Sequence, residues 1–313
     1  MIKSQMKKVY KSIRRTALEK EQWQIAIRKR SDKPLYMGGS DRFSTVPNTV
    51  RYWYADPFLY EKDGKTYLFA EMYDRYTEKG VLGVATVKHN KVSKFKVCLD
   101  LPYHLSYPCL YEDNTNLYMI PECRQSGEVA VYKCVDFPYK WEKDHCLYEC
   151  TGVDTTMVPQ EICGSDKIYI TTINTQTDHN NNLFLIDENK KEVRNLIKDN
   201  TKVRCGGYFI KHDDIWLRPA QDDTEYYGCK LIFYNVDSIG VDGISERVYA
   251  EIFAPDADNK GICIKIDKQK NCRYVGVHTY NCNGQYEVID LVRHNSRTFK
   301  VWLCNIIKKL RKK

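Results

Sequence analysis

The sequence predicts an all-β fold, a five-bladed β-propeller, with short amphipathic helices at both termini. Two observations lead to this prediction. A strand–turn–strand unit recurs at intervals of about fifty residues, which is within the range typical of propeller blades. Most copies are followed by a further run of strand-forming residues, as expected when each blade is a four-stranded sheet beside a central channel.

The first repeat, residues 51–71, shows the pattern clearly. Its turn, Lys62-Asp63-Gly64, separates two runs of strand-forming residues and is a β-hairpin signal. A short hairpin brings the outer ends of its two strands together. Asp56 and Glu71 are therefore expected to lie close in space.

Four further copies follow the first. They span residues 106–122, 154–172, 205–221 and, more weakly, 261–280. The predicted third strands of the five blades are residues 83–87, 128–133, 182–186, 230–235 and 287–292. The propeller domain is accordingly assigned to residues 31–292.

The two ends of the chain are assigned to separate segments. Residues 1–30 combine a predicted basic helix with a strand-like alternation at residues 22–28, which we expect to close the ring by pairing with the last repeat. Residues 293–313 are predicted to be a basic amphipathic helix, because Phe299, Trp302 and Ile306 recur at helical spacing between lysines and arginines. Its apolar face could enter a membrane surface or dock on the propeller.

Charge is distributed unevenly along the chain. The net charge is +8, yet residues 1–30 hold ten Lys/Arg against two Glu, and residues 293–313 hold eight Lys/Arg and no acid. Each end therefore carries +8 and the intervening residues −8. This pattern argues against nucleic acid as a partner and favours an anionic membrane surface, the alternative being that both ends are simply solvated.

The cysteines and the hydropathy pattern predict a cytoplasmic protein. Together with the basic ends, they leave open peripheral attachment at the inner membrane face. The 13 cysteines include no CxxC pair, and no apolar core of a signal peptide or 18-residue apolar run is present. No metal ligands are predicted from spacing. A divalent cation in the central channel, with His278 as a ligand, stays open as a cofactor.

Equivalent positions of the five repeats should converge on the channel, because the first strand of each propeller blade lines it. These positions carry different polar residues rather than one type, namely Asp56, Glu71, Glu122, Asp154, Arg218 and His278. Paired carboxylates supply the acid and the base of glycosyl chemistry, while Arg and His could hold a phosphate or carboxylate group. The alternative, expected for two or three of the six, is hydrogen bonding between blades.

Aromatic side chains near these positions are candidates for stacking on sugar rings. They are Trp53, Tyr54, Tyr107 and Tyr280. The remaining candidate substrate-binding residues lie in the same segments and are Arg51, His104, Gln221 and Asp222.

Several segments resemble a known family. The start of the first blade, Ala55-Asp56-Pro57-Phe58, is similar to the propellers of glycoside hydrolase family 43. A closer resemblance is to the N-terminal domain of glucosamine inositolphosphorylceramide transferase and its stand-alone bacterial relatives. It extends over residues 50–292 through the segments 51–58, 104–108, 118–122, 135–141, 218–222 and 276–281.

The resemblance implies a five-bladed fold and roles for two aspartates. Asp56 matches the general base of the hydrolases, and Asp154 matches the aspartate that tunes their acid. In those hydrolases the general acid is a glutamate at the start of the fourth blade, where this chain has Cys205-Gly206-Gly207. This difference argues against hydrolysis of that type and leaves Glu122 or Glu71 as the acid.

The predicted function is sugar transfer or remodelling at the cytosolic membrane surface, in envelope or capsular glycan assembly. A sugar or glycan is the expected substrate. Asp56 would activate the acceptor, Glu122 would act as the acid, and Arg218 with His278 would orient the substrate. The alternatives are a family 43-type glycoside hydrolase and a non-catalytic glycan-binding scaffold for glycan-assembly enzymes.

Overall fold

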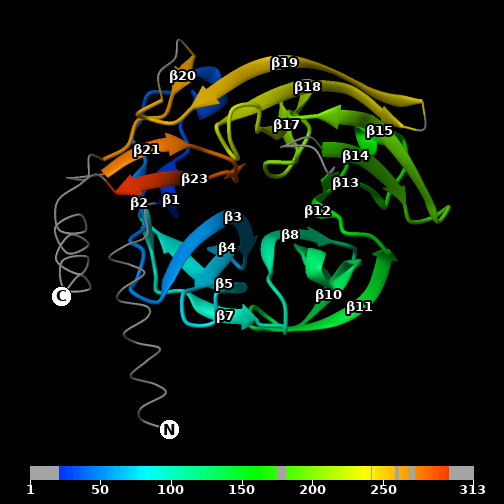
Figure 1. Cartoon of the computed structure of the whole chain (residues 1–313), viewed down its shortest axis with the longest axis horizontal. Helices are drawn as coiled ribbons and strands as arrows, with labels where there is room; N and C mark the ends of the chain where they lie inside the picture. The colour runs from blue at the N-terminus through cyan, green and yellow to red at the C-terminus, as the bar shows by residue number, and fades with distance from the viewer. Residues whose placement is uncertain (1–20, 175–180, 241, 258–260, 268–271, 296–313) are drawn as a thin grey trace, which may run out of the picture.

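The computed structural model describes residues 21–174, 181–240, 242–257, 261–267 and 272–295. Five antiparallel sheets surround a central axis like the blades of a propeller, which confirms the predicted fold (Figure 1). The predicted N-terminal helix, at residues 1–20, lies outside the described residues. So does most of the predicted C-terminal helix, although residues 293–295, assigned to it, instead continue a strand.

The first two blades follow the chain in order from the channel outward. Blade I contains β3 (Tyr52–Lys62), β4 (Lys65–Asp74) and β5 (Lys79–Lys88), with the short β6 (Lys91–Val92) and β7 (Lys96–Leu99) both paired to β5. Blade II contains β8 (Ser106–Glu112), β9 (Leu117–Glu122), β10 (Val129–Asp136) and β11 (Lys140–Tyr148).

Blades III and IV repeat this order. Blade III contains β12 (Val153–Met157), β13 (Ile168–Asn174), β14 (Asn181–Asp187) and β15 (Glu192–Asn200), with the helical turn α2 (Gln160–Cys163) after β12. Blade IV contains β16 (Ile210–His212), β17 (Ile215–Asp222), β18 (Lys230–Gly240), β19 (Gly243–Phe253) and the parallel edge strand β20 (Ile262–Cys263).

Blade V joins the two ends of the described chain. Its central strand, β23 (Tyr286–Asn295), pairs with β1 (Glu21–Lys29) on one side and with β21 (Cys272–Gly276) and β22 (Tyr280–Cys282) on the other. The edge strand β2 (Ser44–Thr45) completes the sheet. The predicted closing strand is thus confirmed.

The sequence reasoning placed the fifth repeat incorrectly. Residues 262–263 belong to the outer edge of blade IV, residues 272–282 are innermost in blade V, and residues 286–295 form its second strand rather than its third. The physical reason is that β1, from the other end of the chain, supplies the third strand. The segments predicted as the second and third strands of blade V are therefore the first and second strands of its sheet.

A buried ion pair fixes the closing strand. The Arg28 Nε atom donates to Glu287 Oε2 at 2.6 Å, and both side chains are almost completely buried. Glu287 Oε1 also accepts hydrogen bonds from the Leu35 backbone N–H at 2.8 Å and the Tyr280 hydroxyl at 2.5 Å. These contacts connect β1, β22 and β23 inside the sheet.

A bulge shapes the innermost strands of three blades. Asp56, Tyr107 and Asp154 have φ angles of 48°, 45° and 50°, and the strand register shifts at each. Tyr107, not Ser106, is therefore the equivalent of Asp56 in the second blade. Gly207 has a φ of 141°, where an added Cβ would lie 2.0 Å from the Tyr280 carbonyl oxygen. Such strained positions commonly occur at functional sites.

The buried cysteines fill space in the core. Cys109 and Cys205 are completely buried, and burial raises the pKa of their thiols to about 12 and about 11, so both stay neutral. Within the described ranges, no helix has the length and apolar character needed to cross a bilayer.

Candidate functional site

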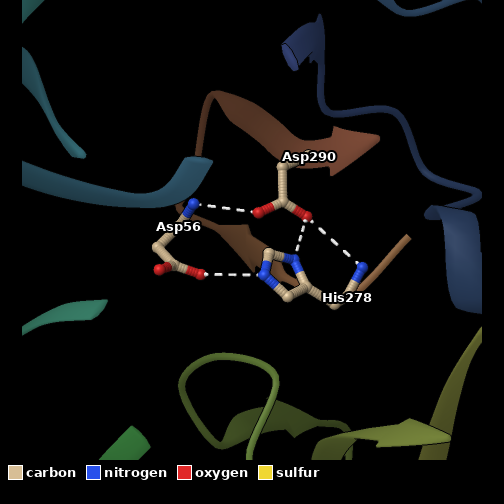
Figure 2. A group of neighbouring side chains, drawn as sticks. All are labelled: Asp56, His278 and Asp290. Atoms are coloured by element: carbon tan, nitrogen blue, oxygen red, sulfur yellow. Dashed lines mark hydrogen bonds and ion pairs between the residues drawn. The ribbon is translucent and has the colours of Figure 1, made fainter. Parts of the chain in front are cut away.

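One cluster at the channel joins blades I and V. Asp56 comes from β3, His278 from the segment between β21 and β22, and Asp290 from β23 (Figure 2). His278 Nδ1 donates to Asp290 Oδ1 at 2.7 Å, and the Asp56 backbone N–H donates to Asp290 Oδ2 at 2.9 Å. His278 Nε2 lies 3.5 Å from Asp56 Oδ1. Asp290 thus orients both the imidazole and the backbone of Asp56.

The charge state of this cluster follows from burial and neighbouring charges. Burial raises the pKa of Asp56 to about 7; the His278 imidazolium opposes this shift, and neighbouring carboxylates reinforce it. Burial lowers the pKa of His278, but the Asp290 carboxylate more than offsets that effect and raises it to about 9. At neutral pH, His278 is therefore protonated and Asp56 can exchange a proton.

Two further donors hold the Asp56 carboxylate in place. The Thr279 hydroxyl donates to its Oδ1 atom at 2.9 Å, and the Tyr107 backbone N–H donates to its Oδ2 atom at 3.1 Å. The carboxylate is only 5% exposed. Its position is therefore fixed by the neighbouring blades on both sides.

A second cluster lies across blades II to IV. Arg204 donates through Nε to Asp154 Oδ2, and its Nη2 atom is 3.3 Å from Glu122 Oε2. Gln221 Nε2 donates to Asp154 Oδ2 at 2.8 Å, whereas its buried Oε1 atom has no hydrogen-bond partner among the described residues. Gln221 is 1% exposed, so its role here is to position Asp154.

Glu122 has the properties of a general acid. Burial raises its pKa to about 8; the Asp154 carboxylate adds to this shift and Arg204 opposes it. The Glu122 side chain is 14% exposed, so a ligand can reach it. The charge of Asp154 also raises the pKa of Asp56, which indicates that the two clusters share one electrostatic environment.

An aromatic cavity of about 840 Å³ adjoins the clusters through two of its lining residues, Trp23 and Tyr227. The Trp23 ring stacks on His278 with 3.7 Å between ring centroids. The Tyr227 ring meets His278 edge-on, with 5.4 Å between ring centroids. The Arg204 guanidinium lies 5.0 Å from the centroid of the Tyr227 ring. The lining residues are Gln22, Trp23, Trp53, Tyr73, Tyr226, Tyr227, Val275, Val292 and His294. We refer to this space as the aromatic cavity.

The first cluster does not fit a metal ion in this arrangement. Potential ligand atoms of Asp56, His278 and Asp290 lie within 4.8 Å of one another. However, Asp290 already accepts four hydrogen bonds, from the backbone N–H groups of Asp56, His278 and Thr279 and from the His278 ring. Three of these bonds reach Oδ1 and one reaches Oδ2, and His278, protonated at neutral pH, has no ring lone pair to offer a cation.

The structure brings six of the predicted site residues to the clusters or the cavity. Asp56, Glu122, Asp154, Gln221 and His278 belong to the clusters, and Trp53 lines the cavity, stacked on Tyr73 at 4.6 Å. Glu71 and His104 form a neighbouring pair, with His104 Nε2 3.3 Å from Glu71 Oε1. The Gly80 backbone N–H donates to His104 Nδ1, which favours the neutral tautomer with its proton towards Glu71.

Arg218 is a correction to the sequence prediction. It is 1% exposed and donates through Nε and Nη2 to Glu246 at 2.9 and 2.6 Å. A third bond goes to the Val203 carbonyl at 3.1 Å. Arg218 therefore has a structural role within blade IV, and Arg204 is the arginine at the carboxylates.

Five other predicted binding residues have structural surroundings. Tyr107 and Tyr280 are completely buried, which leaves no ring face for a sugar. Tyr54 is 4% exposed and stacks on Phe95. Asp222 is 1% exposed and lies 3.4 Å from Lys230 Nζ. Arg51, although partly exposed, is held by a bidentate contact with Asp74.

Sequence reasoning missed several residues that the tertiary structure assembles. They are Trp23, Arg204, Tyr227, Thr279 and Asp290. Arg204 directly precedes the predicted start of the fourth repeat, Cys205-Gly206-Gly207, and this proximity was the available signal. No sequence signal indicated Asp290, because its strand was predicted to be the third strand of the fifth blade, away from the channel.

Fold and site together define a five-bladed propeller whose channel holds two carboxylate clusters beside an aromatic cavity. The chain belongs to the family described as glucosamine inositolphosphorylceramide transferase 1, N-terminal, which it matches over residues 42–262. The match excludes most of blade V, including Trp23, His278 and Asp290.

Similar proteins agree with this assignment. The chain is 30% identical over 220 residues to glucosamine inositolphosphorylceramide transferase 1 of Arabidopsis thaliana, covering 66% of this chain and 28% of that protein. It is 26% identical over 200 residues to the protein of the same name from Oryza sativa subsp. indica, covering 59% and 26%. The chain thus spans about a quarter of the length of these curated relatives.

The fold is shared with a solved enzyme. The structure of beta-1,2-mannobiose phosphorylase from Listeria innocua matches with a TM-score of 0.52 at 12% identity, covering 85% of this chain and 96% of that chain. At this identity the likeness shows the propeller fold alone.

Proposed function

We propose that this propeller binds a sugar in the aromatic cavity and transfers or remodels it, with Asp56 and Glu122 as the acid–base pair. The observation that supports this proposal is a pair of carboxyl groups with raised pKa values whose cationic partners, His278 and Arg204, contact the rings of that cavity. Ionised Asp56 would take a proton from an acceptor hydroxyl, and protonated Glu122 would give one to the leaving oxygen. Aromatic rings such as Trp53 would stack on the sugar.

Transfer is favoured over hydrolysis of the family 43 type. The fourth blade has Gly206 and Gly207 where the hydrolases carry their acid, and the named relatives are transferases. We place the reaction in the cytoplasm, in assembly of an envelope or capsular glycan. Cys109 and Cys205 are free thiols in the core, which is consistent with a reducing compartment.

A thermal-shift screen tests the binding step. Nucleotide sugars, free nucleotides and neutral oligosaccharides are each added to purified protein, and we expect one sugar class to raise the melting temperature. A ligand at a hundred times its Kd stabilises the folded state by about 2.7 kcal/mol. Selective stabilisation by a nucleotide sugar would identify the donor of a transferase.

Two matched tryptophan variants locate the binding. Trp53→Ala removes a wall of the aromatic cavity and should abolish the shift, whereas Trp216→Ala alters a different cavity, of about 510 Å³, and should preserve it. The proposed site is wrong if no sugar raises the melting temperature. It is also wrong if Trp216→Ala abolishes the shift while Trp53→Ala preserves it. Binding without turnover of any tested sugar would instead support the glycan-binding scaffold.

The pH dependence of turnover tests the acid–base assignment. Asp56 acts when deprotonated, so kcat/KM should rise with pH through about 7; Glu122 acts when protonated, so it should fall through about 8. The expected profile is a narrow bell between these values, measured on the sugar identified in the screen. The two limbs belong to the coupled pair rather than to isolated residues. A maximum below pH 5, as for ordinary carboxyl groups, would contradict the assignment.

A further inference from the structure

The chain enters and leaves the propeller at the rim of the aromatic cavity. Gln22 of β1 and His294 of β23 both line the cavity. The two strands pair there, with Glu21 opposite His294 and Gln22 opposite Arg293. The sequence segments that continue from these strands, residues 1–20 and 296–313, are therefore attached beside the cavity opening. We call them the basic terminal segments.

Their charge is opposite to that of the remaining chain. Residues 1–20 contain seven Lys/Arg and one Glu, and residues 296–313 contain seven Lys/Arg and no acid. Together they carry +13, while the whole chain carries +8, so residues 21–295 carry −5. Apolar residues such as Phe299 and Trp302 recur among these cations. Basic segments with interspersed Trp and Phe bind anionic lipid surfaces.

The cavity rim beside the two paired attachment points is aromatic. Tyr226 and Tyr227 are 39% and 37% exposed, and Trp53 and Tyr73 are partly exposed beside them. The Asp56 carboxylate, by contrast, is buried below the rim. Trp and Tyr are the residues enriched at the level of lipid headgroups, because their rings are apolar and their N–H or O–H groups are polar.

We propose that this rim is a docking surface for an anionic lipid bilayer, on which the propeller stands with its aromatic cavity facing the membrane. The basic terminal segments contact the acidic headgroups, and Trp53, Tyr226 and Tyr227 enter the interface between them. The opposite end of the channel, where Lys211 and Trp216 line another cavity, faces the solvent. This orientation does not depend on the sugar chemistry proposed above.

Vesicle co-sedimentation of the full-length chain tests the attachment. We expect binding to vesicles with 30% phosphatidylglycerol in phosphatidylcholine, little binding to phosphatidylcholine alone, and release by high salt. The triple variant Lys308→Gln/Lys309→Gln/Arg311→Gln should weaken binding roughly a hundredfold, from the known contribution of each basic residue near such a surface. The control with the same change in charge, Lys140→Gln/Lys190→Gln/Lys191→Gln, should bind normally; these lysines lie on the outer strand β11 and in the turn between β14 and β15.

Hydrogen–deuterium exchange on the vesicle-bound protein tests the orientation. Backbone amides of residues 51–54 and 224–228, at the rim, should exchange more slowly on binding, and those of residues 209–216, at the opposite end, should not change. Slower exchange at residues 209–216, or no slowing anywhere in the propeller, would overturn the orientation. Equal binding to neutral and anionic vesicles, or equal loss in both charge variants, would overturn the docking surface. Asp56→Asn should bind vesicles normally, which separates this proposal from the catalytic one.

Discussion

Replacing Asp56 with asparagine is expected to lower turnover by roughly 10²–10⁴-fold, the range that a positioned acid or base contributes. Asparagine has nearly the same shape: its amide oxygen can accept from the Tyr107 N–H while its NH₂ group donates to the Thr279 hydroxyl, but it cannot accept the proton of an acceptor hydroxyl. The melting temperature should therefore stay close to that of the original protein. The measurement is initial rate on the sugar that the thermal-shift screen identifies.

The matched control is Asp237→Asn. This aspartate is half-exposed on the outer part of blade IV, where it pairs with Arg247 at 2.8 Å. The same change in charge there should leave turnover unchanged. If Asp56→Asn folds normally and retains full turnover, Asp56 takes no part in the chemistry, and the glycan-binding scaffold becomes the better account.

Replacing Arg28 with alanine is expected to reduce the free energy of unfolding by about 3–5 kcal/mol. The substitution leaves Glu287, which is 0% exposed, without its cationic partner. It also removes the guanidinium that donates to the Asp41 carbonyl at 2.7 Å. Because Arg28 lies on β1 and Glu287 on β23, the loss should loosen closure of the ring. Denaturant unfolding measures the change.

Two comparisons separate this effect from a general loss of stability. Adding Glu287→Gln to the Arg28→Ala variant removes the isolated buried charge and should restore part of the lost stability. Arg247→Ala breaks an exposed ion pair, with side chains 63% and 51% exposed, and should cost no more than about 1 kcal/mol. Equal losses for Arg28→Ala and Arg247→Ala would show that the buried pair does not secure the closing strand.

The sequence by itself determined the architecture, because its signals are local. A hairpin turn such as Lys62-Asp63-Gly64 is specified by neighbouring residues, and its recurrence identifies the blades. The same regularity identified Asp56 and Asp154 as equivalent channel residues, and both adopt the same bulged conformation. The alternation of residues 22–28 was sufficient to predict the closing strand.

Which residues meet at the site depends on long-range packing. Asp290 contacts His278 because β1 supplies the third strand of blade V and β23 is therefore the second strand, next to the innermost β21 and β22, which no local pattern records. Arg204 reaches Asp154 while Arg218 turns to Glu246, a choice made by strand register and by which partner lies nearby. Hairpins depend on adjacent residues, whereas these contacts join residues 12 to 50 positions apart, so their pairing follows from packing around the ring.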